Sequence, residues 1–122
     1  ALSEFFLNNF ETSDNALDQR LKPHYYNNDY HTTQHLITSC LNQVGFKMIN
    51  VDNYYHEMLF EYKRIRVIVI LNEMSLYDIR VDMKINAKYV LPLKRPIKII
   101  AKLYEILDRK LTLKYLGGER NE

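Results

Sequence analysis

Cysteine, glycine and proline are scarce in this chain of 122 residues, which has one Cys, three Gly and three Pro. A single cysteine, Cys40, cannot form a disulfide within the chain, and this favours a reducing compartment. No apolar run reaches the roughly 18 to 20 residues of a membrane-spanning helix, and no basic segment followed by an apolar stretch opens the sequence. We therefore expect a cytoplasmic protein with no membrane span.

The motifs of common nucleotide and zinc enzymes are also missing. Two of the three glycines are adjacent, and the chain has neither a G-x-G-x-x-G nor a Walker sequence. His31 and His35 are the candidate metal ligands because they lie four residues apart, but Thr32, Thr33 and Gln34 stand between them, without the Glu of an H-E-x-x-H site. We expect no metal site and no cofactor.

No set of residues has the pattern of a catalytic site. The neighbours of Cys40 are mainly apolar, which is typical of a buried thiol and not of a nucleophile. The residues favour a protein that is not an enzyme. One enzymatic alternative stays open, with His24 or His56 in a pocket under a sheet.

Hydrophobic residues make up 47% of the chain and charged residues 26%, as in an ordinary globular protein. The length fits one domain, which we place at residues 1–122. The spacing of Leu2, Phe5, Phe6 and Phe10 predicts a loosely attached helix within residues 1–16. Residues 117–122 are expected to form a flexible tail.

Two longer segments have the apolar spacing of a helix. Residues 30–44 follow the turn and cap residues Asn27 to Asp29, carry an apolar stripe and precede Gly45. The second helix starts near Pro96, and its stripe runs from Ile97 to Leu111.

Alternating or β-branched segments between these helices predict strands. They are 46–51, 54–62, 64–71 and 76–85, with turns at 52–53 and 72–75, an extended or edge segment at 17–26, and a further short piece at 89–93. The connections are too short for parallel crossovers. The sequence thus predicts an α+β fold, in which an antiparallel meander of four to five strands carries the central and the C-terminal helix on one face. The strand at 64–71 is expected to be covered on both faces.

Charge is unevenly distributed along the chain. Residues 1–62 contain three basic and eight acidic residues, whereas residues 63–122 contain 14 basic and seven acidic residues. Such asymmetry indicates an anionic partner or self-association, unless the two halves interleave in space.

Ten tyrosines are the main indication of a binding surface. Adjacent residues of a strand face opposite sides, so at least one ring of each Tyr-Tyr pair should be half exposed. Tyrosine is enriched at protein interfaces. We predict a non-enzymatic protein-interaction module that self-associates as a homodimer or docks a protein partner, and the candidate partner-binding residues are Tyr25, Tyr26, Tyr54, Tyr55 and Tyr62.

The basic residues near the C-terminal helix support an alternative, a nucleic-acid-binding protein. The candidate phosphate contacts are Lys94, Arg95, Lys98, Lys102 and Lys110. The tyrosines lie mainly in the acidic half of the chain, away from these cations, which is unlike a stacking groove for bases.

The stretch Arg20-Leu21-Lys22-Pro23-His24-Tyr25-Tyr26, followed by a helix and then by Gly45-Phe46-Lys47-Met48-Ile49, resembles small uncharacterised bacterial cytosolic domains. In these domains a basic and aromatic entry segment precedes a helix and a meander. The resemblance covers about residues 20–62. It implies a compact α+β module of unknown role and assigns no functional residue.

Overall fold

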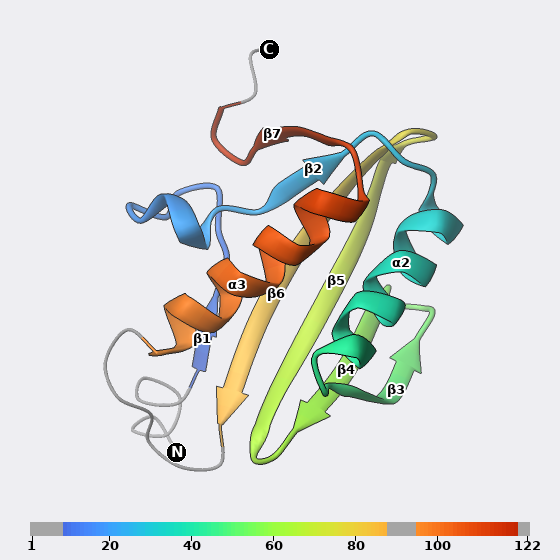
Figure 1. Cartoon of the computed structure of the whole chain (residues 1–122). Coiled ribbons are helices and arrows are strands. Elements are labelled where there is room, and N and C mark those ends of the chain that lie inside the picture. Colours follow the sequence, from blue (N-terminus) through green and yellow to red (C-terminus); the bar gives the residue numbers. More distant parts are fainter. Residues whose placement is uncertain (1–8, 88–94, 120–122) are drawn as a thin grey trace.

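In the part of the chain that the structure describes, an antiparallel sheet of seven strands carries two helices on one face (Figure 1). The computed structural model describes residues 9–87 and 95–119. In chain order the elements are β1 (Asn9–Glu11), a 3-10 helix η1 (Gln19–Leu21), β2 (His24–Tyr26), α2 (Tyr30–Gln43), β3 (Lys47–Asp52), β4 (Glu57–Tyr62), β5 (Ile65–Ser75), β6 (Asp78–Ala87), α3 (Arg95–Lys110) and β7 (Leu113–Leu116). The predicted α+β class, with both helices on one face of an antiparallel sheet, is confirmed.

The strands lie in the order β3-β4-β5-β6-β2-β7. Four consecutive strands, β3 to β6, form the predicted meander. The long strand β6 then has two partners along its far side, since β1 pairs with residues 84–86 and β2 pairs with residues 79–81. Sequence neighbours form one half of the sheet, and segments far apart in the chain form the other.

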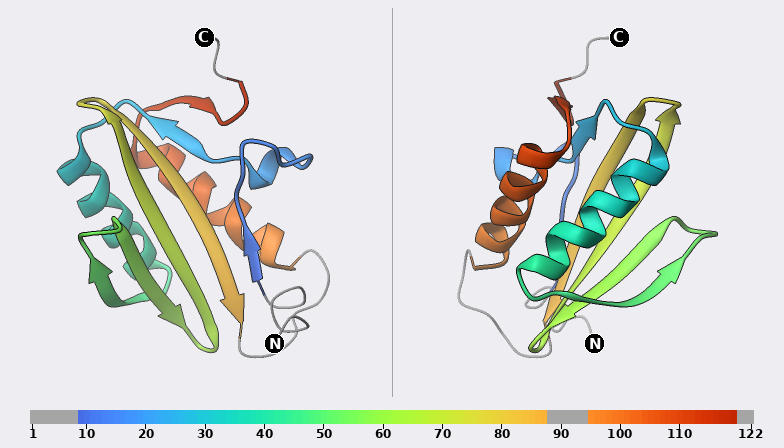
Figure 2. Two further views of the ribbon diagram at one scale, coloured as in Figure 1. Left: turned by 180° about the vertical axis from the view of Figure 1, so that it is seen from behind. Right: turned by 45° about the vertical axis from the view of Figure 1, so that its right-hand side comes forward.

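The two faces of the sheet have different surroundings. Figure 2 shows, in its view from behind, the strands with no helix in front of them. On the helix side, alternate residues of β5 and β6 are buried, among them Val67, Val69, Val81 and Met83. On the opposite face, Ile68 of β5 is only half buried. The expectation that residues 64–71 are covered on both faces is therefore wrong, because both helices pack on the same side.

The two longer predicted helices are present with the predicted end signals. Asp29 is the N-cap of α2, where its carboxylate accepts a hydrogen bond from the backbone N–H of Thr32 at 3.2 Å. Gly45 follows α2 with a φ of +102°, the left-handed conformation that favours glycine. Pro96 is the second residue of α3, where no intrahelical donor is required.

Two predicted hairpin turns are displaced. The predicted strand 54–62 begins at Glu57, because the chain turns through Tyr54 and Tyr55 while Asp52 accepts hydrogen bonds from both of their backbone N–H groups at 3.0 and 3.1 Å. The predicted turn at 72–75 is strand, since β5 continues to Ser75. Strand β5 is longer than its apolar run because its last residues pair with β6.

Both ends of the described chain contain strands that the sequence did not predict. Asn9–Glu11 pairs with β6, so the predicted helix within 1–16 is wrong for these residues, and residues 1–8 lie outside the described part. At the other end, Leu113–Leu116 pairs with β2. Gly117 is buried, and its N–H donates to Pro23 O at 2.7 Å, so Gly117 is not part of a loose tail.

The predicted extended or edge segment at 17–26 contains the 3-10 helix η1 and the strand β2, which is not at an edge of the sheet. Pro23 precedes β2, so its missing N–H removes no ladder hydrogen bond, and β2 lies between β6 and β7. The predicted piece at 89–93 lies outside the described residues. Within the described part of the chain, neither helix has the length and apolar character needed to cross a bilayer.

Candidate functional site

A groove lies between the C-terminal end of α2, the first three turns of α3 and the turn from β4 to β5. Figure 1 labels these helices and strands. Its volume is about 320 Å³. Apolar side chains dominate its lining: Val44, Phe46, Ile65, Ile99, Leu103 and Ile106. One tyrosine and three cations complete it: Tyr62, Lys63, Arg95 and Lys102. The groove is thus an apolar trough with positive charge around it.

One wall of the groove is the ring of Tyr62, which lies close to the backbone of Gly45. The ring of Tyr62 lies against Gly45, where an added Cβ would stand 2.8 Å from Tyr62 Cε1. The ring also packs on Phe46, with centroids 5.5 Å apart. Lys63 follows with a φ of +57° and places its ammonium 5.2 Å from the Tyr62 ring centroid. A glycine and a strained turn residue therefore hold an aromatic wall with a cation beside it.

The apolar floor comes mainly from α3. Ile99, Leu103 and Ile106 recur at spacings of four and three residues, which places them on one helical face. Leu103 is buried, whereas Ile99 and Ile106 are half buried and extend the core to the surface.

The cations around the groove are little neutralised by acidic neighbours. Lys102 lies 3.7 Å from Glu105, an exposed ion pair of small energetic value. Within the described residues, neither Lys63 nor Arg95 forms an ion pair with an acidic side chain. The trough is suited to a ligand that combines an apolar face with negative charge.

The structure divides the five candidate tyrosines among three places. Tyr25 and Tyr26 face opposite sides of β2, as predicted, but both are buried. The expectation that one of these two rings is half exposed is wrong, because Tyr115 of β7 packs on Tyr25 with centroids 4.8 Å apart. Neither ring can meet a partner in this arrangement.

The other three tyrosines are accessible but separated. Tyr54 and Tyr55 are 81% and 64% exposed in the turn before β4, with their rings edge to face 4.8 Å apart. Tyr62, 39% exposed, is at the far end of β4, roughly 20 Å away by the rise of an extended strand. Only Tyr62 belongs to the groove.

Tyr26 belongs instead to a polar cluster between β2 and α3. Its hydroxyl donates to Asp108 Oδ1 at 2.7 Å, and His24 Nδ1 lies 2.9 Å from the same oxygen. Burial, and then the charge of Asp108, raise the pKa of Tyr26 far above its ordinary range. His24 is 7% exposed, so this histidine joins elements together and does not open into a cleft.

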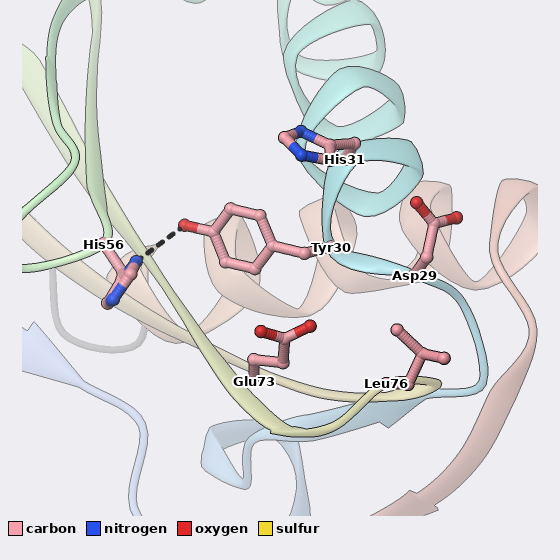
Figure 3. Close-up of a pocket in the computed structure, with 6 residues that line it drawn as sticks. All are labelled: Asp29, Tyr30, His31, His56, Glu73 and Leu76. Atoms are coloured by element: carbon pink, nitrogen blue, oxygen red, sulfur yellow. Dashed lines mark hydrogen bonds between the residues drawn. The ribbon is translucent and has the colours of Figure 1, made fainter.

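The other histidine of the enzymatic alternative, His56, lies in a surface hollow of about 350 Å³ (Figure 3). Tyr30 Oη lies 3.1 Å from His56 Nδ1. His56 has a φ of +57°, unusual for a residue other than glycine. Burial, followed by the charge of Glu73, raises the pKa of Tyr30.

His31 and His35, the candidate metal ligands, line different hollows. Figure 3 shows His31 beside Tyr30 and Asp29, whereas His35 lines a separate depression along α2 with Thr38. Asp29 is occupied as the cap of α2, and the hydrogen bonds from Thr32 lower its pKa. Residues 9–87 and 95–119 contain no group of three or more His, Cys, Asp or Glu side chains placed to hold a metal ion.

Four of the five candidate phosphate contacts are on α3, and Lys94 lies outside the described residues. Arg95, Lys98 and Lys102 are exposed within two turns of the helix. Lys110 is exposed at its last residue, about 22 Å from Arg95 by the helical rise. Only Arg95 and Lys102 line the groove.

Sequence reasoning identified three groove residues, Tyr62, Arg95 and Lys102, but in two separate candidate sites. It did not identify Lys63 or the apolar floor. Lys63 could have been found from its place in the short polar turn between the apolar strands β4 and β5. Comparison of the chain with protein-family models, curated proteins and solved structures finds no match. The resemblance of residues 20–62 to bacterial domains therefore stays a prediction.

Proposed function

We propose that this protein is a non-enzymatic protein-interaction module whose groove binds an acidic amphipathic segment of a partner protein. The observation that carries the proposal is the combination of an apolar floor with three cations, Lys63, Arg95 and Lys102. An amphipathic helix binds by placing its apolar face in such a groove, and complementary charge around the groove favours and orients its acidic side chains. The proposed location is the cytoplasm, as the single, buried Cys40 favours.

The floor supports this proposal because it is only partly covered. Ile99 and Ile106 are half buried and Val44 is 41% exposed, so a docked apolar face would remove more of their surface from water. Tyr62 adds an aromatic side chain of the kind that carries much of the binding energy at protein interfaces.

Two matched model peptides test the proposal by fluorescence anisotropy. Both have leucines at helical spacing, and one carries Glu and the other Lys at its remaining positions. We expect the acidic peptide to bind and the basic peptide to bind at least tenfold more weakly, because two or three unfavourable charge contacts exceed about 1.4 kcal/mol in total. Equal affinity for the two peptides, or no binding of the acidic one, would contradict the proposal.

Two charge reversals on the same helix locate the binding surface. Lys102 lines the groove, so Lys102→Glu should lower the affinity for the acidic peptide severalfold. Lys98 is exposed and does not line the groove, so Lys98→Glu should change this affinity much less. Ile99→Asn removes apolar surface from the floor and should also weaken binding. Equal effects of Lys98→Glu and Lys102→Glu would point to general charge attraction and not to the groove.

The exposed cations on the first two turns of α3 favour a second candidate function, the binding of nucleic acid. Here Lys98 and Lys102 would contribute equally, and affinity for a labelled duplex should fall steeply with added salt because each phosphate contact releases counterions. Undetectable binding at low salt would reject this candidate.

A further inference from the structure

Strand β3 is the last strand at one side of the sheet (Figure 2). It pairs with β4, and no other strand of the described chain lies along its outer edge. The side chain of Ile49 is 54% exposed and that of Val51 36% exposed. An open edge of this kind can accept a further strand by main-chain hydrogen bonds.

A bulge in β3 determines which of its side chains share a face. Met48 is opposite Phe60 and Val51 is opposite Met58, both buried residues on the helix side. Lys47 and Asp52 are opposite Glu61 and Glu57, on the other face of the sheet. The register shifts between Met48 and Asn50. Lys47 and Asp52, five residues apart, therefore lie on the same face, which a regular strand would not allow.

We propose that β3 pairs antiparallel with β3 of a second copy of this chain, with Lys47 opposite Asp52 of the second copy and Met48 opposite Val51 of the second copy. The two-fold axis is perpendicular to the sheet between Ile49 and Asn50, so each face of one sheet continues into the same face of the other. This register is possible because the bulge places both members of each pair on one face. It forms two pairs of opposite charge and two apolar pairs, and it covers Ile49.

Charge complementarity is the reason for a second copy as the occupant. On their face, Asp52 and Glu57 are like-charged neighbours, and no ion pair of either with a cation is found within residues 9–87 and 95–119. Lys47 of the second copy would reduce that repulsion. A bulge and charged residues also discourage pairing with unrelated strands, so the edge selects a strand whose charges run in the opposite order.

Charge reversal tests the pairing by analytical ultracentrifugation of the full chain over a range of concentrations. A six-residue strand pair is a small interface, so we expect dimer at the upper end of this range. Lys47→Asp places Asp opposite Asp52 in both symmetric pairs and should raise the dimer dissociation constant roughly tenfold. Asp52→Lys should do the same. An equimolar mixture of the two variants should dimerise again, because every pair is then of opposite charge.

Lys98→Asp is the matched control for Lys47→Asp. It changes the net charge by the same amount, but at a residue of α3 that lies away from the edge of β3. Its dimer should persist, as should that of Lys102→Glu, which separates this proposal from binding in the groove. A wild-type monomer at all concentrations, or a dimer that Lys47→Asp leaves intact, would overturn the proposal.

Disulfide cross-linking tests the register itself. The native Cys40 is buried, so an introduced cysteine would be the accessible thiol of the described residues. Asn50→Cys places two thiols beside the two-fold axis and should cross-link on oxidation. Lys47→Cys places them about 16 Å apart along the strands, too far for a disulfide. Cross-linking of Lys47→Cys but not of Asn50→Cys would overturn this register.

Discussion

The rings of His24 and Tyr104 are stacked, with centroids 3.7 Å apart and planes 3° from parallel. Through this contact β2 packs on the middle of α3. Tyr104 is 2% exposed, and its hydroxyl donates to the carbonyl oxygen of Val81 at 2.7 Å. One side chain thus ties the helix to two strands of the sheet.

Removing the hydroxyl of Tyr104 should destabilise the fold. Tyr104→Phe keeps the ring on His24 but leaves the carbonyl of Val81 without this donor, and we expect a loss of about 1–3 kcal/mol in the free energy of unfolding, measured with urea. Tyr54→Phe, at an exposed position, is the control and should leave stability unchanged. An unchanged free energy of unfolding in Tyr104→Phe would show that water or another donor replaces the hydroxyl.

The buried tyrosines should make the protein less stable at high pH. Burial raises the pKa of Tyr26 and of Tyr104 well above the usual value of about 10. Above that pH the unfolded chain releases the phenolic protons and the folded chain keeps them, so the free energy of unfolding falls as pH rises. Each such group contributes a slope of about 1.4 kcal/mol per pH unit.

Single tyrosine replacements separate these contributions. Tyr26→Phe should reduce the alkaline slope by one group, whereas Tyr55→Phe, at an exposed position, should leave the slope as it is. Urea unfolding at several pH values above 10 provides the measurement. An identical slope in Tyr26→Phe and wild type would mean that Tyr26 ionises without unfolding.

Arg80 should contribute more to stability than an exposed arginine of the same sheet. Its guanidinium donates to Asp82 and to Asp14, each at 2.7 Å, and to Tyr25 Oη at 3.2 Å. Arg80→Ala leaves partly buried carboxylates without their cation and should cost about 2–3 kcal/mol. Arg80→Lys should recover little of this lost stability, since an ammonium lacks the planar array of donors of a guanidinium.

The matched control for Arg80 is Arg66, whose exposed ion pair with Glu61 spans 2.9 Å. Arg66→Ala should cost less than about 1 kcal/mol. Thermal unfolding of the two variants in the same buffer compares them directly. Similar losses for both would mean that the partial burial around Arg80 does not strengthen its contacts.

Gly117 should not tolerate a side chain. A Cβ there would collide with the carboxylate of Asp14 and the ring of Pro23. Gly117→Ala should therefore lower the free energy of unfolding by about 1–3 kcal/mol, the usual cost of overpacking. Thr112→Ala, exposed just before β7, is the control, with little change expected. Full stability of Gly117→Ala would mean that Asp14 and Pro23 both move aside at little cost.

The helices and the meander could be predicted because their signals are local. The stripe around Cys40 and the cap at Asp29 define α2, and the alternation of Ile79, Val81 and Met83 defines the buried face of β6. Turn positions were less predictable. The strand pairing that extends β5 to Ser75 depends on the partner strand and not on the apolar pattern of the segment.

The charge division of the chain is an example of a pattern that tertiary structure alters. Arg80 of the basic half contacts Asp14 of the acidic half, and Arg66 contacts Glu61 in the same way. The halves therefore interleave along the sheet, although Arg95 and Lys102 remain together at the groove.

By itself, the sequence determined the class of fold and the apolar faces of α2, α3 and β6, because helical and alternating periodicities are properties of short segments. Tertiary structure alone decided which tyrosines are accessible, since β7 covers Tyr25 from a position about 90 residues later in the chain. It also decided where the groove lies. The packing of α3 against the sheet brings Ile99 and Lys102 to the same groove as Tyr62. The spacing of residues within a short segment contains no information about this contact.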